Sequence, residues 1–236
     1  MADSAPAVRE GIPPRVRLVV FDLDGTLADT FEDIAQATNR ALRAFGRPTL
    51  DPATIKNYVG RGARNLMARA LGPEHEQFAD AAAVLWSEYY ERHPIDHTRL
   101  YPGAVRLLEW LRARKVVTAI LSNKLDRLTQ QIAAAMGLAA RVDIVRGEND
   151  EFPRKPHPAV LEHYASLFGV RPDEMLVVGD SAPDIELARG TGAAFCGVLT
   201  GQFGREEFAA LGVAWIVETL EALRCQLEAA GACAEE

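Results

Sequence analysis

Short apolar runs rich in β-branched residues recur along this sequence, separated by segments with the spacing of amphipathic helices. The predicted strands are Val16–Leu23, Val116–Leu121, Val142–Val145, Met175–Val178, Ala194–Leu199 and Trp215–Val217. Most of them are continuous apolar stretches, which is typical of strands buried on both faces of a parallel sheet. Helices are predicted at Gly103–Arg114, Asp126–Met136, Pro158–Phe168 and Asp184–Arg189. This alternation predicts an α/β fold with a Rossmann-like doubly wound parallel sheet.

The stretch from Phe31 to Arg99 breaks the alternation, because it has helical patterns but no buried strand. The helical patterns cover Ile34–Phe45, Asn65–Leu71 and Gln77–Arg92. A helical domain in series would leave the first strand on its far side, so connectivity favours an insertion that caps the carboxyl end of the sheet. Thr30 and Asp33 resemble a helix capping box at the start of this insertion.

These patterns predict three segments with distinct roles. Residues 15–32 and 101–236 form the α/β catalytic core, and residues 33–100 form an inserted all-helical cap domain. Residues 1–14 form a flexible N-terminal arm.

Composition limits the partners of this chain of 236 residues. The formal net charge of -7 argues against a broad nucleic-acid surface, so an anionic substrate must be met by a local arrangement of positive charge. No apolar run approaches the ~20 residues of a membrane span, and the N-terminus does not resemble a signal peptide. Cys196, Cys225 and Cys233 lack disulfide or zinc spacing and are expected to be reduced thiols. We therefore expect a cytoplasmic protein with no membrane partner, either a monomer or a homodimer.

Asp22 and Asp24 stand at the end of the first predicted strand, just before Gly25. Residues two apart in a strand point to the same side, so both carboxylates can face one crevice. Two carboxylates this close repel each other unless a cation or a shared proton lies between them. Magnesium favours a few carboxylate oxygens and keeps several waters. A solvated acidic turn is the alternative interpretation of this segment taken alone.

Three more polar sites follow predicted strands. Ser122 and Asn123 come after the second strand, where a hydroxyl and an amide can donate to phosphate oxygens at a helix start or simply cap the helix. Lys155 lies in a proline-rich loop before a helix and suits a point charge aimed at phosphate. Asp180 and Asp184 follow Met175–Val178 and can bind a metal, or serve as a turn residue and a helix-start acid.

The combination of the four sites decides between these alternatives. In open α/β sheets, ligands bind in the crevice outside the carboxyl ends of the strands. Four such ends here supply acids, a hydroxyl and a lysine. The sequence therefore predicts a site for a divalent cation and a phosphoryl group. Lys124 follows Asn123 near a helix start, where the dipole disfavours a cation, and this indicates an anionic surrounding.

At this point a resemblance appears. Phe21–Leu27, Leu121–Lys124, Arg154–Pro156 and Gly179–Asp184 resemble, in order, the four motifs of the haloacid dehalogenase superfamily. The helical insertion is similar to the small α-helical cap found in that superfamily. Within it, Asn57–Leu66 followed by Arg69–Leu71 resembles the phosphoglycolate phosphatase branch.

The resemblance implies roles for the residues of the core. Asp22 would attack phosphorus and become an aspartyl phosphate, and Asp24 would act as acid and then as base. Ser122, the Asn123 backbone and Lys155 would hold the phosphoryl oxygens. The cofactor would be Mg²⁺, held by Asp22, the Asp24 carbonyl and Asp180, with Asp184 supporting.

Substrate choice is expected to lie in the cap. Gly60 and Gly62 flank Arg61 in a predicted turn between helices, and they let Arg61 approach a ligand closely. We expect Arg61, with Arg64, to meet a second anionic group such as a carboxylate, although both can also be solvated surface arginines.

The predicted function is that of a Mg-dependent phosphomonoester hydrolase acting on a small phosphorylated metabolite, with 2-phosphoglycolate as the first candidate. The alternatives are a sugar phosphomutase on the same fold and a phosphatase for another sugar, amino-acid or nucleotide monophosphate. A non-catalytic regulatory protein is disfavoured, because every core position carries a competent residue.

Overall fold

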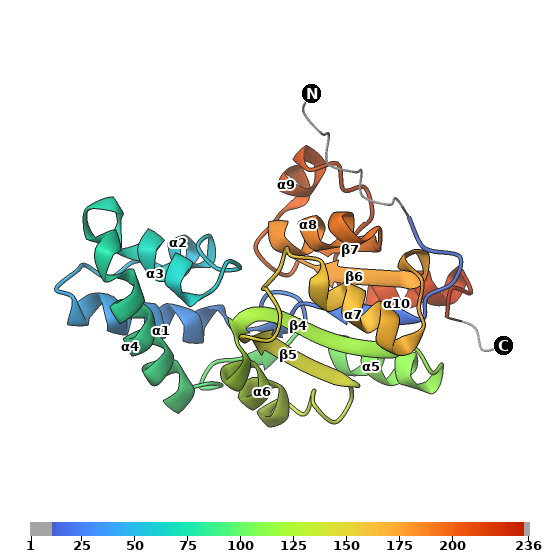
Figure 1. Cartoon of the computed structure of the whole chain (residues 1–236), viewed down its shortest axis with the longest axis horizontal. Helices are drawn as coiled ribbons and strands as arrows, with labels where there is room; N and C mark the ends of the chain where they lie inside the picture. The colour runs from blue at the N-terminus through green and yellow to red at the C-terminus, as the bar shows by residue number, and fades with distance from the viewer. Residues whose placement is uncertain (1–10, 234–236) are drawn as a thin grey trace.

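A six-stranded sheet with the strand order β5-β4-β1-β6-β7-β8 forms the core, and every neighbouring pair of strands is parallel (Figure 1). The computed structural model describes residues 11–233. The strands are β1 (Leu18–Phe21), β4 (Val117–Leu125), β5 (Ile144–Glu148), β6 (Met175–Gly179), β7 (Ala194–Val198) and β8 (Ile216–Val217). Each corresponds to a predicted strand, so the predicted fold class is confirmed.

Helices cover both faces of this sheet. On one face, Val19 and Phe21 of β1 belong to a core shared with α5 (Ala104–Ala113), α6 (Asp126–Ala135) and α10 (Leu220–Ala229). On the other face, Leu18 and Val20 pack with α7 (Ala159–Phe168), α8 (Ala182–Thr191) and α9 (Arg205–Ala210). Because successive side chains of a strand point to opposite faces and both faces are dry, every position of β1 must be apolar. A short helical turn, η2 (Pro172–Glu174), precedes β6.

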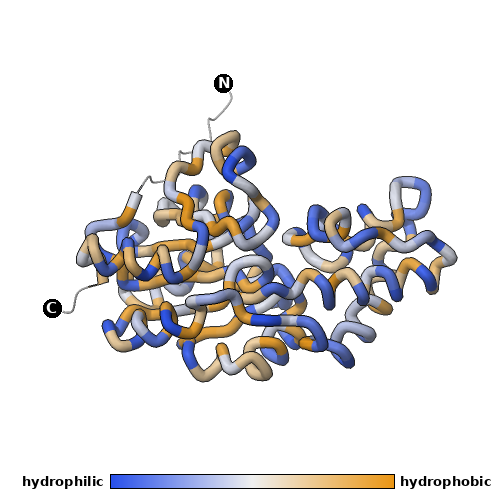
Figure 2. The backbone as a smooth tube through the Cα atoms, turned by 180° about the vertical axis from the view of Figure 1, so that it is seen from behind, coloured by the Kyte–Doolittle hydropathy of each residue, from blue (hydrophilic) through white to orange (hydrophobic). Residues whose placement is uncertain are grey.

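The cap is a separate group of helices beside the sheet, seen at the left of Figure 1 and at the right of Figure 2, where hydrophilic and hydrophobic residues alternate along its helices. It comprises α1 (Phe31–Ala44), α2 (Pro52–Lys56), α3 (Ala63–Leu71), η1 (Pro73–Phe78) and α4 (Ala79–Arg92). The chain enters through β2 (Ala28–Asp29) and returns through β3 (Arg99–Leu100), which pair as an antiparallel ribbon that was not predicted. The cap is thus inserted after the first strand, and its predicted limits, residues 33–100, stay a prediction.

The strand order fixes where a ligand can bind. From the central strand β1 the chain proceeds outward through β4 and β5, and then returns to β6 on the other side of β1. The crevice at such a reversal, outside the carboxyl ends of the strands, is the usual ligand site of open α/β sheets. Asp22 directly follows β1 and Asp180 directly follows β6, so both carboxylates lie at this point.

The predicted capping box at Thr30 and Asp33 is wrong, although α1 does begin at Phe31. The Thr30 hydroxyl donates to Asp24 Oδ1 instead of accepting from a helix N–H group. Asp33 accepts hydrogen bonds from the backbone N–H groups of His97 and Thr98 and from the Thr98 hydroxyl, the last at 2.7 Å. Both side chains therefore form hydrogen bonds with segments outside the helix start, which the capping-box pattern does not cover.

The N-terminal arm, the cysteines and the possibility of a membrane span concern parts of the chain away from the site. The predicted arm, residues 1–14, falls mostly outside the described residues. Cys196, Cys225 and Cys233 are free cysteines, and their reduced state stays a prediction. None of the helices within residues 11–233 has both the length and the apolar character of a membrane span.

Asp33 provides a test of how the cap is tied to its return strand. Substituting Asp33→Ala leaves buried donors of the 97–98 segment without an acceptor, so the free energy of unfolding should fall by about 2–4 kcal/mol. Urea denaturation measures this change. Asp80→Ala is the control, because Asp80 lies in an exposed ion pair with Arg64 and its loss should cost less than about 1 kcal/mol. Equal denaturation midpoints for the two variants would contradict the prediction.

Candidate active site

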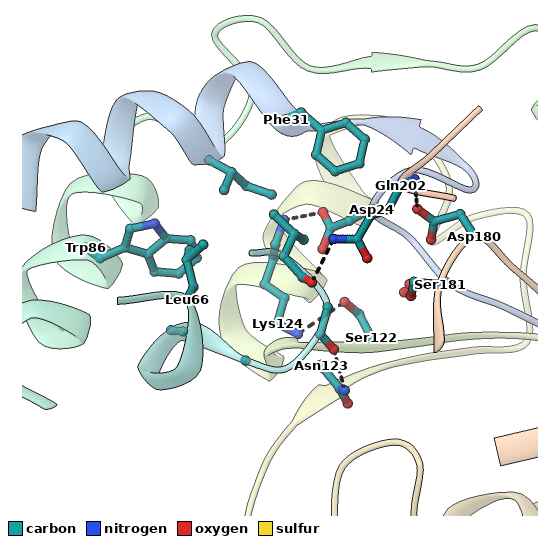
Figure 3. Close-up of a pocket in the computed structure, with 16 residues that line it drawn as sticks. Asp24, Phe31, Leu66, Trp86, Ser122, Asn123, Lys124, Asp180, Ser181 and Gln202 are labelled. Atoms are coloured by element: carbon teal, nitrogen blue, oxygen red, sulfur yellow. Dashed lines mark hydrogen bonds and ion pairs between the residues drawn. The ribbon is translucent and has the colours of Figure 1, made fainter. Parts of the chain in front are cut away.

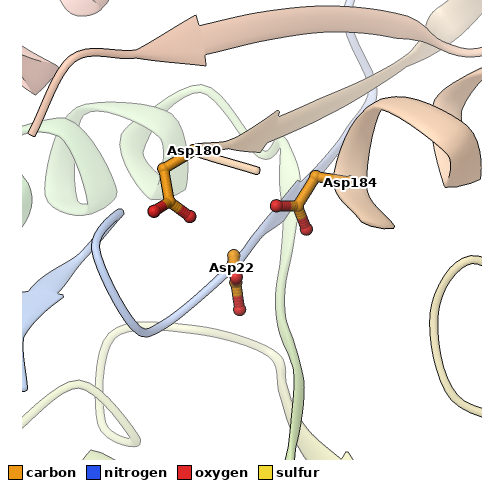
Figure 4. Close-up of side chains that lie close together, drawn as sticks. All are labelled: Asp22, Asp180 and Asp184. Atoms are coloured by element: carbon orange, nitrogen blue, oxygen red, sulfur yellow. The ribbon is translucent and has the colours of Figure 1, made fainter. Parts of the chain in front are cut away.

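Three carboxylates meet at the carboxyl ends of β1 and β6 (Figure 4). One oxygen of each of Asp22, Asp180 and Asp184 lies within 4.8 Å of the others, and all three side chains are buried. Asp22 and Asp180 come from the loops after the two strands, and Asp184 comes from the first turn of α8. The structure therefore brings together three of the four acids that the sequence analysis selected.

Lys155 is the cation that faces this cluster. Its Nζ lies 2.9 Å from Asp22 Oδ1 and 2.7 Å from Asp184 Oδ1, and the lysine is buried. The other oxygen of Asp184 accepts a hydrogen bond from the Ser181 hydroxyl. Asp22 Oδ1 also accepts one from the backbone N–H of Leu23, and this leaves Asp22 Oδ2 as the oxygen available for chemistry.

Burial dominates the electrostatics of the cluster. Desolvation raises the pKa of Asp22 to about 7, opposed by Lys155 and reinforced by Asp184 and Asp24. Desolvation also raises the pKa of Asp180 well above its usual value, with the charges of Asp22 and Asp184 adding to the effect. Burial lowers the pKa of Lys155, but the two carboxylates it contacts, Asp184 and Asp22, raise it overall. A single lysine therefore does not balance the charge of the three buried carboxylates, and the cluster keeps an excess of negative charge.

A divalent cation fits this donor set. Hard oxygen ligands from carboxylates suit Mg²⁺, and an added positive charge would offset the repulsion among the three acids. Two glycines make room for the Asp180 carboxylate, because a side chain at either position would collide with it. A Cβ atom added to Gly201 would lie 1.9 Å from Asp180 Oδ2, and one added to Gly25 would lie 2.3 Å from the same atom. Gly25 also has φ +79°, a conformation that side chains rarely adopt. The backbone N–H of Gln202 donates a hydrogen bond of 2.6 Å to Asp180 Oδ2 and so holds this carboxylate in place.

Asp24 faces the same cavity but has a separate set of partners. Its Oδ1 lies 2.5 Å from Lys124 Nζ and also accepts from the Thr30 hydroxyl. Lys124 in turn donates to the Tyr90 hydroxyl at 3.0 Å and is buried. Within the part of the chain that the structure describes, the hydrogen bonds to the Asp24 carboxylate go to Oδ1, so Oδ2 is the oxygen left for proton transfer.

Sequence reasoning missed most of these partners. The position of Lys124 indicated an anionic surrounding, and Asp24 is that surrounding. Thr30 was assigned to the helix end, and Tyr90 and Gln202 carried no local pattern that marks a site residue. Tyr90 belongs to α4 of the cap, so its contact with the core depends on how the cap folds back.

Ser122 and Asn123 lie within β4, not at a helix start, because the strand continues to Leu125 and α6 begins at Asp126. Ser122 is buried and lines the cavity. The Asn123 side-chain amide does not face a phosphate position as predicted. It donates at 2.8 Å to the carbonyl of Gly60 in the cap and at 2.9 Å to the carbonyl of Lys155. The backbone of Asn123 stays a predicted phosphate ligand.

The two cap arginines lie outside the cavity. Arg61 Nη2 is 3.4 Å from Glu186 Oε1 with its side chain 51 % exposed, and Arg64 pairs with Asp80. The turn that carries Arg61 is as predicted, since Gly60 and Gly62 have φ values of +106° and +85° and separate α2 from α3. Substrate binding by Arg61 and Arg64 stays a prediction that these contacts do not support.

A narrow cavity of about 40 Å³ separates the core loops from the cap (Figure 3). Asp22, Asp24, Asp180, Ser122 and Lys124 line its core side. Five apolar cap side chains line the opposite side: Phe31, Ile34, Val59, Leu66 and Trp86. Such an arrangement can hold a phosphoryl group against the acids and a small organic group against the cap.

Comparison with known proteins gives one consistent family. The model of the haloacid dehalogenase-like hydrolases matches residues 19–198. The chain is 34% identical to the phosphoglycolate phosphatase of Chromobacterium violaceum over 215 residues, covering 88% of this chain and 95% of that protein. It is 36% identical over 191 residues to phosphoglycolate phosphatase 1 of Pseudomonas aeruginosa, covering 78% of this chain and 69% of that protein.

A solved structure agrees with these relatives. The crystal structure of a predicted phosphoglycolate phosphatase from Haemophilus somnus superposes with a TM-score of 0.81 at 28% identity. The match covers 89% of this chain and 97% of that one. The similarity therefore includes both the sheet and the cap.

Metal binding can be tested without an activity assay. At Mg²⁺ concentrations near 100 times Kd, the melting temperature should rise by about 5–10 °C, because a ligand of the folded state stabilises it by about 2.7 kcal/mol. Asp180→Asn should remove this shift while leaving the metal-free melting temperature at or above that of the wild type, since a desolvated charge is lost. Asp173→Asn, in an exposed pair with Arg171, should keep the shift. A full shift in Asp180→Asn is the outcome that contradicts the assignment.

The raised pKa of Asp22 predicts the pH dependence of stability in the presence of a chelator. Between the unfolded value of 3.8 and the folded value of about 7, the folded chain binds a proton that the unfolded chain has lost. The contribution of Asp22 to the free energy of unfolding should therefore fall as the pH rises from 4 to 7 and then level off. Urea denaturation across this range should give a flatter profile for Asp22→Asn. Parallel profiles for variant and wild type would sink this prediction.

Proposed function

The chain belongs to the haloacid dehalogenase-like hydrolase family and is a phosphatase, and from this premise we propose that it hydrolyses a small phosphomonoester through a phosphorylated Asp22. The observation that carries the proposal is the contact of Asp22 with Lys155 beside Asp180 and Asp184. A carboxylate with a free oxygen, a buried cation and two further acids is the equipment for phosphoryl transfer to an aspartate.

In the first step, Asp22 Oδ2 attacks phosphorus and the bond between phosphorus and the ester oxygen breaks. Asp24 Oδ2 gives its proton to the departing oxygen, so the leaving group departs as an alcohol. Lys124 and Thr30 hold the other oxygen of Asp24, and this fixes the direction in which the proton is transferred. Positioning of this kind supplies much of the rate enhancement in phosphoryl transfer.

In the second step, a water attacks phosphorus and gives a proton to Asp24. The bond between phosphorus and Asp22 Oδ2 breaks, inorganic phosphate leaves, and both aspartates return to their starting states. Ser122 lines the cavity and the buried Lys155 contacts Asp22, and these two residues would hold the phosphoryl oxygens through both steps. Lys155 also keeps its contact with Asp184, so its ammonium group stays oriented.

Asp22, Asp180 and the Asp24 carbonyl would hold Mg²⁺, with Asp184 in support. When bound, the ion supplies positive charge that offsets the negative charge gathered on the phosphoryl group. The crowding of Asp180 by Gly25 and Gly201 supports this assignment, because the backbone there is shaped around a carboxylate.

We propose 2-phosphoglycolate as the substrate. The relatives from Chromobacterium violaceum and Pseudomonas aeruginosa are both named phosphoglycolate phosphatases. The narrow cavity, with a wall of apolar cap side chains, also favours a short leaving group over a nucleoside or a hexose.

Asp22→Asn is the variant that tests the mechanism. Magnesium-dependent phosphate release from 2-phosphoglycolate should fall by at least about 1000-fold, because the nucleophile is lost, while the fold is retained. Asp173→Asn should keep the wild-type rate. Surviving Mg-dependent hydrolysis in Asp22→Asn would falsify the proposed mechanism.

A panel of phosphomonoesters tests the substrate. With Mg²⁺, kcat/KM should be highest for 2-phosphoglycolate among sugar, nucleotide and amino-acid monophosphates. A higher value for one of those compounds would move the assignment to it. Isomerised sugar phosphate formed without release of phosphate would instead identify a phosphomutase.

A further inference from the structure

The cavity between core and cap has an uneven distribution of charge (Figure 3). Its cap wall offers only apolar side chains and the small residues Gly60, Gly62 and Ala63. On the core side the charged side chains are Asp22, Asp24, Asp180 and Lys124. Within the described residues, Lys124 is therefore the one cationic side chain that lines this cavity.

Lys124 is held firmly and retains capacity for a further partner. Its side chain is 3% exposed, and its Nζ donates to Asp24 Oδ1 and to the Tyr90 hydroxyl. An ammonium group has three N–H donors, so one of them remains for a ligand in the cavity. Tyr90 packs edge-on against Trp86, and the lysine therefore lies where the acids meet the apolar cap wall.

The chemistry of the leaving group makes this position significant. In an ester of a 2-hydroxy acid, a single carbon separates the ester oxygen from the carboxylate. The ester oxygen must lie against Asp24, which protonates it. A cation for the carboxylate must therefore lie next to Asp24, and Lys124 is in contact with Asp24 at 2.5 Å.

We propose that Lys124 binds the carboxylate of the leaving group and is the residue that selects phosphorylated 2-hydroxy acids. This inference rests on the proposed function and assigns its specificity to the core, not to Arg61 of the cap. An ion pair at a buried site gains most where the surrounding is apolar, and the cap side chains provide that surrounding. They also limit the substituent that the acid can carry on its second carbon.

Two matched substrates test the assignment. 2-Phosphoglycolate and ethyl phosphate have the same length and the same ester, and they differ by the carboxylate. The quantity measured is the ratio of their kcat/KM values. Lys124→Met should lower this ratio by about 10- to 100-fold, as expected for a lost charged hydrogen bond. Most of the loss for 2-phosphoglycolate should appear in KM.

The ratio separates recognition from a structural role. Misplacement of Asp24 or general loosening of the site lowers both kcat/KM values and leaves their ratio unchanged. Lys124→Arg keeps the positive charge on a side chain of different length. Its kcat/KM ratio should therefore lie between that of Lys124→Met and that of the wild type. It also serves as the test variant if Lys124→Met does not fold, as judged by circular dichroism.

Arginine variants complete the design. Arg40→Met, at an exposed cap position, should leave the ratio at the wild-type value. A ratio that falls in Arg61→Met, or that stays unchanged in both folded Lys124 variants, overturns the inference. Failure of the wild type to hydrolyse either ester counts against the proposed function itself, so the two failures are distinguishable.

Discussion

Repulsion among three buried carboxylates is the constraint around which this molecule is built. One carboxylate oxygen of each of Asp22, Asp180 and Asp184 lies within 4.8 Å of the others at a buried site, and Lys155 contacts two of these residues. The sheet can support such a cluster because β1 and β6 are buried on both faces and well packed. The stability of the apolar sheet thus offsets the unfavourable charge at its edge, an arrangement typical of active sites.

Sequence patterns predicted the sheet well because of its double burial. Strands covered on both faces need continuous apolar runs, and such runs are visible without knowledge of the fold. The same logic placed Asp22, Lys155, Asp180 and Asp184 together, since the carboxyl ends of parallel strands meet at one edge. The ribbon of β2 and β3 was missed because two residues per strand carry no periodicity.

Side-chain partners were harder to predict than positions. Thr30 had the sequence context of a helix cap, yet its hydroxyl is used by Asp24. Lys124 pairs with Asp24 and Tyr90, which are far from it along the chain, so no local spacing can indicate either contact. Polar groups form the hydrogen bonds that the folded surroundings offer, and these surroundings are set by long-range packing.

Part of the contact between cap and core is made through the cap backbone. Carbonyl groups of Lys56, Gly60 and Arg61 accept hydrogen bonds from Gln202, Asn123 and Arg154, which lie on three different loops or strands of the core. Contacts to main-chain atoms do not depend on which side chains the cap turn carries. The sequence of the cap wall can therefore change with the substrate while the cap keeps its place.

The Asn123 amide has a consequence for how the cap and the site are positioned. One NH₂ group donates both to the Gly60 carbonyl of the cap and to the carbonyl of Lys155, the lysine that contacts Asp22. A single planar group thus joins the cap turn to the loop that carries Lys155. Both acceptors are main-chain carbonyls, so a change in the position of either one would alter the hydrogen bond to the other. The position of the cap turn and that of the Lys155 backbone are in this way linked through one side chain.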